Sequence, residues 1–175
     1  AVLDHSGDSV KIKYYFDIAD THPGAGAREV PLWTAREEYA QTMIAALEAS
    51  FGPLEKSGSL ADAIISASKR IAADSISDSL QDLLTQRDGS LLEELDELNL
   101  EYRLRSLAAD SAAYMTLTRC GLDAGRYFDA EDFAFLREFN TPQTFNVLAE
   151  TSHSAAEAEL SQLAKTVLDL AHKRN

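Results

Sequence analysis

Hydrophobic and polar residues alternate strictly near the start of the chain, over residues 10–18. The apolar positions of this segment are Val10, Ile12, Tyr14, Phe16 and Ile18. A period of two is typical of a β-strand with one buried face, and the turn-rich residues 4–9 separate this strand from Val2 and Leu3. The pattern therefore predicts a β-hairpin. Because an isolated hairpin is only marginally stable in water, we expect it to pack on other elements.

After residue 33 the hydrophobic period changes to about 3.6, which is typical of amphipathic α-helices. Thr34 and Glu37 have the spacing of a capping box, in which a hydroxyl and a carboxylate each satisfy a free amide of the first turn. One apolar stripe then continues to Phe51, and Gly52–Pro53 is a typical helix end. The first helix is therefore predicted over residues 34–51.

A second helical segment is predicted between Ser59 and Asp88–Gly89. Ser59 and Asp62 have the spacing of an N-terminal cap, which sets the start of the segment. Its apolar stripe changes near Asp74–Ser75, where two residues that favour turns follow each other. The pattern therefore predicts a break in the helix at that point.

The longest helical pattern runs from Leu91 to Cys120. Ser90 and Glu93 have capping-box spacing in front of it, and Gly121 is a typical C-terminal stop. Two apolar stripes share these thirty residues, so the helix is predicted to be bent or buried on two sides. We expect it to be the central helix of the domain.

Two further helices are predicted after the central one. Acidic residues 129–132 precede a small helix with Phe133 and Leu136, and Thr141–Pro142 is a cap followed by proline at the first helical position. The apolar stripe of the closing helix is Ala156, Leu160, Leu163, Val167 and Leu170. The sequence thus predicts a mainly α fold, with five to seven helices around the central helix and a small N-terminal β-hairpin packed on it.

Length and composition fit one globular domain. Of the 175 residues, 45% are hydrophobic and 26% are charged, which excludes disorder as the default state. We expect a hairpin and connector over residues 1–33 and a helical domain over residues 34–175. The apolar runs are far shorter than the roughly 20 residues that cross a membrane, so we expect no membrane contact. Because the chain starts at Ala1 and not at Met, we expect it to be part of a longer protein.

Charge and residue counts limit the chemistry. Sixteen Lys and Arg residues against 29 Asp and Glu residues give a net charge of −13, which disfavours a surface built to follow phosphates. The single cysteine, Cys120, excludes an intrachain disulfide and fits a reducing, cytoplasmic compartment. The four histidines are widely separated, and no His-Glu-x-x-His motif occurs. The sequence therefore predicts no metal, no cofactor and no enzymatic activity.

Two surfaces are candidates for partner binding. Lys11, Lys13 and Tyr15 share the polar face of the predicted strand, which is typical either of contact with single-stranded DNA or of a strand edge protected by solvated lysines. An acidic run is typical either of a solvated helix face or of a contact for a basic protein. The members of that run nominated for contact are Glu93, Glu94, Glu97 and Glu101.

Two segments resemble antirestriction proteins of the ArdC and LtrC type, which are encoded on plasmids and conjugative elements. Tyr15-Phe16-Asp17-Ile18-Ala19-Asp20-Thr21 is similar to the Phe-Asp-x-x-(Asp/Gln)-Thr sequence that closes their N-terminal domain. Residues 104–128 resemble their later helix, where a Leu-x-Ala-Glu-x-x-Ala-(Tyr/Phe) pattern precedes a small-residue stop and an aromatic segment. Together the two matches cover about a third of the chain.

The resemblance implies a protein of the transfer or defence machinery of a mobile element. In that family a domain that binds single-stranded DNA precedes a zincin-like metallopeptidase domain. The position that matches the family's glutamate ligand is Asp110, and a single carboxylate does not hold a catalytic zinc. We therefore expect a non-catalytic domain that acts in DNA handling or protein contact. The alternatives are an acidic protein-interaction module and a degenerate metallopeptidase.

Overall fold

The computed structural model describes residues 2–4, 11–13, 22, 24–26 and 33–173. The chain divides into two compact units, Ala1–Leu32 and Trp33–Asn175. Trp33 belongs to the second unit because the Arg119 guanidinium lies 4.1 Å from the centroid of its ring and donates a hydrogen bond to its carbonyl oxygen at 3.1 Å.

The first unit contains two short strands, β1 (Val2–Asp4) and β2 (Lys11–Lys13). They pair antiparallel, with Leu3 opposite Ile12. The rest of the strand predicted over residues 10–18 lies outside the described residues, and so does the turn of the predicted hairpin. The predicted packing of the hairpin on the helices stays a prediction.

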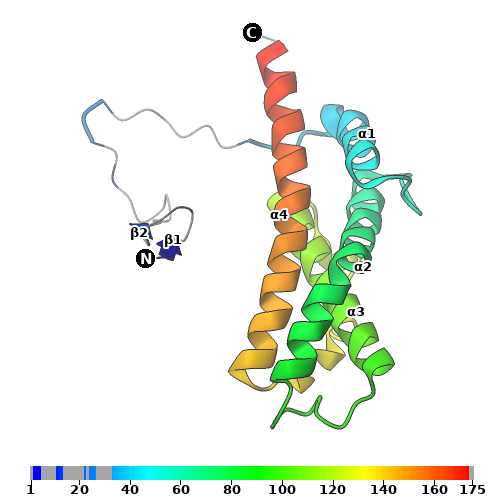
Figure 1. Cartoon of the computed structure of the whole chain (residues 1–175). Coiled ribbons are helices and arrows are strands. Elements are labelled where there is room, and N and C mark those ends of the chain that lie inside the picture. Colours follow the sequence, from blue (N-terminus) through cyan, green and yellow to red (C-terminus); the bar gives the residue numbers. More distant parts are fainter. Residues whose placement is uncertain (1, 5–10, 14–21, 23, 27–32, 174–175) are drawn as a thin grey trace. The chain divides into compact units, whose positions relative to one another are not determined.

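The second unit is a helical bundle (Figure 1). Its α-helices are α1 (Ala40–Phe51), α2 (Leu60–Gln86), α3 (Glu97–Arg119) and α4 (Pro142–Lys173). Each of the helices α2, α3 and α4 packs on the other two, and α1 packs on α2 and α4 at the end of the bundle where the C-terminus lies. The predicted mainly α fold is confirmed for this part of the chain.

Fewer α-helices form than predicted. Residues 33–173 contain four of them, together with three short 3₁₀ helices: η2 (Glu37–Tyr39), η3 (Ala124–Arg126) and η4 (Ala134–Glu138). The small helix predicted after residue 132 is the single 3₁₀ element η4. None of the helices in this range combines the length and the apolar character needed to cross a membrane.

The first helix ends where predicted but starts later. The capping box of Thr34 and Glu37 does not form, because the 3₁₀ turn η2 begins after Arg36, whose side chain makes no capping bond. At the other end Gly52 adopts φ +85°, a backbone conformation that residues with a side chain rarely adopt. Gly52 therefore stops α1 as the sequence predicts.

Helix α2 is continuous where a break was predicted. It starts at the predicted cap, since the Ser59 hydroxyl accepts a hydrogen bond from the Asp62 amide at 3.1 Å. At the predicted break, the Ser75 hydroxyl donates to the Ile71 carbonyl at 2.9 Å and so stays within the helix. Because Ala72 and Ile76 are buried on either side of this position, packing outweighs the weak local preference for a turn.

Helix α3 starts six residues later than the predicted Leu91. The amide of Leu92 donates to the Ser90 hydroxyl at 3.2 Å, so Ser90 caps a short turn and not the long helix. The actual N-cap is Asp96, whose carboxylate accepts from the Asn99 amide at 2.9 Å, and this hydrogen bond lowers the pKa of Asp96. The predicted C-terminal stop is confirmed, because α3 ends at Arg119 and Gly121 has φ +75°.

The core consists of two apolar clusters joined by a layer of alanines. One cluster joins α1 to the N-terminal half of α2 and to the C-terminal halves of α3 and α4, and includes Met43, Leu47, Ile64, Leu117 and Leu163. The other joins the C-terminal half of α2 to the N-terminal halves of α3 and α4, and includes Leu83, Leu100, Leu104, Leu107 and Leu148. Between them lie Ala112, Ala155 and Ala156. Helix α3 is thus buried on two sides, by α2 and by α4, which is one of the two alternatives predicted for it.

The alanine layer leads to a test of how tightly α3 and α4 pack. Replacing Ala112, which is fully buried, with leucine adds three carbons where no space exists, so Ala112→Leu is expected to destabilise the fold by about 1–3 kcal/mol in urea denaturation. Ala73→Leu makes the same change at an exposed position of α2 and is expected to stay within about 0.5 kcal/mol of the wild type. Equal stability of the two variants would contradict close packing at this layer.

Candidate functional site

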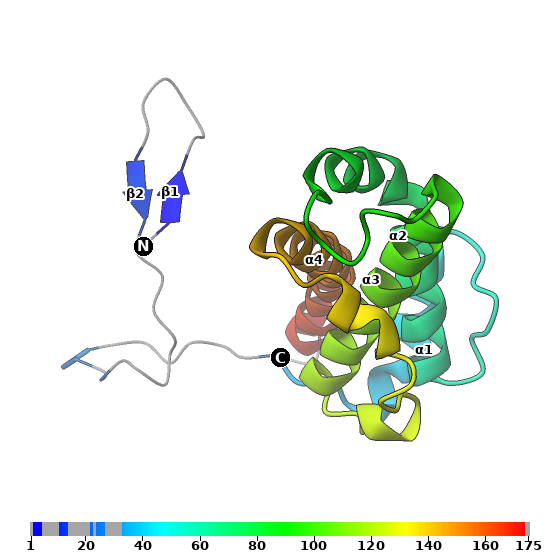
Figure 2. The same cartoon turned by 90° about the horizontal axis from the view of Figure 1, so that it is seen from below.

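The connection from α3 to α4 is not a short loop. Residues 121–141, which we call the return segment, run back along α3 before α4 begins (Figure 2). Phe128 contacts Tyr114 near the C-terminal end of α3, whereas Asn140 accepts a hydrogen bond from the Leu91 amide at 2.9 Å, before the helix starts. The return segment therefore covers one face of α3 over most of its length.

Aromatic rings hold the return segment on α3. The ring centroids of Tyr114 and Phe133 are 6.0 Å apart and nearly perpendicular, and those of Tyr102 and Phe135 are 6.2 Å apart in a similar arrangement. The Phe128 centroid lies 6.1 Å from that of Phe133. Edge-to-face pairs of this kind are favourable beyond the area they bury. We call these five residues the aromatic row.

Arg103 on α3 also holds the return segment, by charge as well as by contact with a ring. The Arg103 guanidinium lies 4.8 Å from the centroid of the Phe135 ring and forms an ion pair with Glu138. Both partners of this pair are about four-fifths buried, so solvent weakens it less than a surface pair. Arg103 therefore fixes the later part of the return segment, at Phe135 and Glu138.

A hollow opens beside the row, between α3 and the return segment. Its volume is about 490 Å³. Three members of the row form its walls together with Met115, and Asp129 contributes a carboxylate. The complete lining is Ser111, Tyr114, Met115, Gly125, Phe128, Asp129, Ala130 and Phe133.

Hydrogen bonds fix the acidic turn that borders the hollow at Asp129. Asp129 Oδ1 accepts a hydrogen bond from the Glu131 amide at 2.7 Å, and Asp132 Oδ2 accepts from the Asp129 amide at 2.8 Å. Nearby on α3, burial raises the pKa of Asp110, and the charge of Asp132 adds to this shift while Lys69 opposes it. Asp129, which lines the hollow, is therefore held in place by hydrogen bonds of the turn to which it belongs.

The nominated acidic residues lie at the start of α3 and in the turn before it. The Glu93 carboxylate accepts from the Gly89 amide at 2.8 Å, and Glu101 pairs with Arg105 at 3.0 Å. Glu94 and Glu97 are exposed, and neither has an ion-pair partner among the described residues. Glu97 and Glu101 are one helical turn apart, so their side chains share one stripe of α3.

Large apolar side chains are exposed beside these carboxylates. Leu91 is 62% exposed, Leu98 is 79% exposed and Tyr102 is 54% exposed. Of the two apolar stripes in residues 91–120, the one with Leu100, Leu104 and Leu107 is buried, whereas the one with Leu91, Leu98 and Tyr102 is exposed. We call the four nominated glutamates together with Leu91, Leu98 and Tyr102 the acidic end.

The nominated DNA-contact residues fall in the first unit. Lys11 and Lys13 belong to β2, but their side chains are outside the described part, and Tyr15 lies outside the described residues altogether. Whether the three form one basic and aromatic face stays a prediction.

The structure gathers no metal-binding cluster in the residues it describes, and Asp110 faces Lys69 and Asp132 but no third metal-binding side chain. Cys120 is buried and free. Burial raises the pKa of its thiol to about 11, with Arg119 opposing the shift and Glu159 adding to it. A protonated, buried thiol is a poor nucleophile.

The most unusual polar group is Glu159, which α4 places in the middle of the bundle with no exposed surface. One carboxyl oxygen accepts a hydrogen bond from Ser68 on α2 at 2.7 Å. The other oxygen and the nearby Thr116 hydroxyl on α3 have no hydrogen-bond partner among the described residues. Burial raises the pKa of Glu159 to about 7, although the hydrogen bond from Ser68 opposes the shift.

No protein-family model, no curated protein and no solved structure matches the chain. The resemblance to ArdC and LtrC proteins therefore stays a prediction. What the helical unit does has to be inferred from its own surface.

The sequence signalled some of these features and not others. Glu159 lies three residues after Ala156 and four before Leu163, so the spacing places it on the buried stripe. A buried acid at this position was nevertheless not predicted. The aromatic row joins α3 to a segment without a hydrophobic period. No local pattern pairs Tyr102 with Phe135 or Tyr114 with Phe133.

Glu159 makes the stability of the fold depend on pH. Its pKa is about 7 in the folded protein against an ordinary 4.5, so the folded state binds the proton more tightly. The contribution of Glu159 to stability is therefore greatest below pH 4.5, falls as pH rises to about 7 and changes no further above it. The neutral variant Glu159→Gln is expected to be about 3 kcal/mol more stable than the wild type at pH 8 and nearly equal to it at pH 4.5.

Urea denaturation at the two pH values measures this difference. The matched control is Glu157→Gln, which removes the same charge from an exposed position of α4 and is expected to change stability by less than about 0.5 kcal/mol at either pH. If Glu159→Gln shifted stability equally at pH 4.5 and pH 8, the buried carboxyl would not titrate as described.

Proposed function

We propose that the helical unit is a non-catalytic protein-interaction domain, and that its acidic end binds a basic, amphipathic segment of a partner protein. The observation that carries the proposal is the exposure of Leu98, 79% of which is open to solvent next to unpaired carboxylates. Two observations support a non-catalytic role: no group of three or more His, Cys, Asp or Glu side chains that could hold a metal ion occurs among the described residues, and the buried Cys120 thiol has its pKa raised to about 11.

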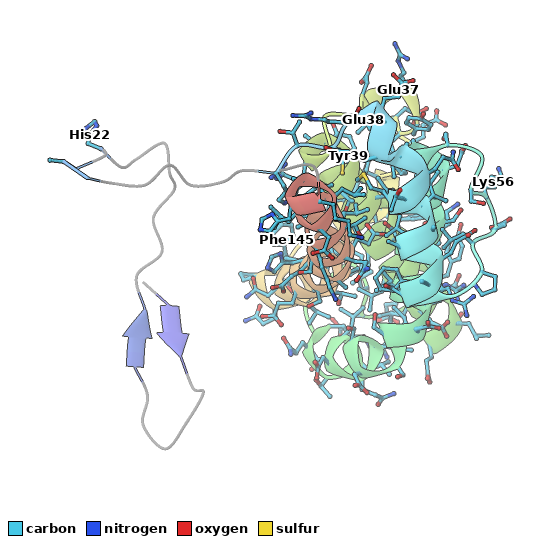
Figure 3. The ribbon with its side chains drawn as sticks, turned by 90° about the horizontal axis from the view of Figure 1, so that it is seen from above. His22, Glu37, Glu38, Tyr39, Lys56 and Phe145 are labelled. Carbon is cyan, nitrogen blue, oxygen red and sulfur yellow. The ribbon has the colours of Figure 1, made fainter. Side chains whose placement is uncertain are left out.

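Apolar contact supplies the first half of the recognition. Leu98 and Tyr102 are one turn apart on α3, so they form a continuous apolar strip on one side of the helix. By contrast, Phe145 is an isolated exposed ring at the edge of the helical unit (Figure 3), and it pairs with no other ring in the described part. Scattered apolar residues are normal on a surface, whereas a strip beside charges is typical of a binding site.

Charge supplies the second half of the recognition. The stripe of Glu97 and Glu101 runs beside the strip of Leu98 and Tyr102, so the surface presents the pattern that an amphipathic segment with lysines or arginines complements. The whole chain carries a net charge of −13, which attracts a basic partner and repels nucleic acid. Such attraction raises the association rate and weakens as salt increases.

The resemblance to ArdC and LtrC proteins adds a cellular setting. If it holds, this domain belongs to a larger protein of a conjugative element and makes a protein contact within its DNA-handling machinery. The acidic end supports protein contact over direct DNA contact, because carboxylates repel phosphates. Any contact with single-stranded DNA would then fall to Lys11, Lys13 and Tyr15 in the first unit.

Fluorescence anisotropy tests the proposal with a labelled helical peptide of alternating leucine and lysine faces. The full chain is expected to bind it, and affinity is expected to fall as sodium chloride rises from about 50 to 300 mM. Leu98→Ser is expected to weaken binding about tenfold, and the double variant Glu94→Gln/Glu97→Gln about threefold.

Matched variants on α4 decide whether the surface or only the net charge matters. Leu168→Ser changes a partly exposed leucine, and Glu150→Gln/Glu157→Gln removes two exposed charges, each without altering the acidic end. These controls are expected to bind like the wild type. Equal losses in test and control variants, or tighter binding of a labelled single-stranded oligonucleotide than of the peptide, would overturn the proposal.

A further inference from the structure

We propose that the hollow beside the aromatic row is an anchor pocket for one lysine or arginine side chain of the partner. The inference rests on the proposed function in so far as the partner is basic. It adds a second contact, at the opposite end of the row from Leu98, and a specific chemistry for it.

The walls of the hollow suit the apolar stem of such a side chain. Tyr114, Phe128 and Phe133 stand with their centroids 6.0–6.3 Å apart, at angles between 50° and 83°, so they surround a space and do not stack flat on one another. Met115, which is 39% exposed, adds a flexible thioether that adapts to the shape of a guest. Aromatic faces also attract a cation directly.

The charges of the hollow select a cation. Asp129 lines it, and the eight lining residues include no lysine, arginine or histidine. One oxygen of Asp129 is held by the Glu131 amide, which leaves the second oxygen available without any loss of the turn. An acidic or purely apolar guest would leave this carboxylate unpaired, whereas an ammonium or guanidinium group pairs with it.

The aromatic row connects the hollow to the acidic end. Tyr102, which belongs to the acidic end, contacts Phe135, and Phe133 two residues earlier in the return segment contacts Tyr114 in the hollow. Tyr102 and Tyr114 are twelve residues apart on α3, a distance of about 18 Å along the helix axis. Because twelve residues also turn α3 by about 120°, a partner segment that reaches both places has to follow the row around the helix as well as along it.

Methyl groups of methionine report on the hollow selectively. The chain has two methionines: Met115 lines the hollow and Met43, on α1, is fully buried in the core. In the full chain labelled with ¹³C at the methionine methyl groups, titration with n-butylammonium chloride is expected to shift the Met115 signal saturably and leave Met43 unchanged. The neutral analogue 1-butanol and equal concentrations of sodium chloride are expected to shift it far less.

Two variants locate the response, because Met115 also borders a second hollow with Trp33 and His153. Asp129→Asn keeps the oxygen that accepts from Glu131 and removes the charge, so the fold should persist while butylammonium affinity falls about three- to fivefold. Tyr114→Leu removes one ring and is expected to weaken binding similarly. Asp78→Asn, on the exposed face of α2, is the control and is expected to match the wild type.

The leucine–lysine peptide separates this inference from the proposed function. If the peptide binds and Leu98→Ser weakens it, but neither peptide nor butylammonium shifts Met115, the anchor pocket is wrong and the acidic end stands. If butylammonium shifts Met115 and Asp129→Asn weakens the response while the peptide does not bind, the pocket stands and the proposed function fails. Equal shifts by 1-butanol and butylammonium would overturn the selection of a cation.

Discussion

The close packing of α3 against both α2 and α4 is the constraint on which the rest of the helical unit depends. Ala108, Ala109, Ala112 and Ala113 are buried on α3, and their small side chains let two neighbouring helices approach it at once. Since these two sides of α3 are filled by helices, its larger side chains at Tyr102 and Tyr114 lie on the remaining surface. The return segment covers part of that surface, and the aromatic row forms where it does so.

The same close packing explains why a carboxyl group in the bundle is costly. Glu159 lies near the alanine layer with no exposed surface, and Ser68 satisfies only one of its oxygens. A leucine at this position would bury apolar area without that cost. The fold thus tolerates a titratable group at its centre. The surface acids at the start of α3 do not contribute to the cost of burying it.

Local sequence signals predicted those features of the fold that residues close together in the chain determine. Gly52 and Gly121 end helices because they adopt positive φ, and Ser59 starts α2 with its hydroxyl. The acidic run was found because charge is visible in sequence. Features set by distant contacts were missed: α2 continues through Asp74–Ser75 because its core face is buried there, and Leu98 faces solvent because Leu100 and its partners already fill the core. The hollow was equally unpredictable, since the return segment forms it from residues without periodicity.

Recognition of a basic segment by the acidic end and the aromatic row is the central claim, and mapping of backbone amide shifts tests it most directly. The full chain labelled with ¹⁵N would be titrated with the leucine–lysine peptide, and each amide signal followed. The account predicts that the largest shifts fall in residues 91–102 and 128–136, on the acidic end and the aromatic row. Largest shifts on α1 or on the C-terminal half of α4, or uniformly small shifts at saturation, would contradict it.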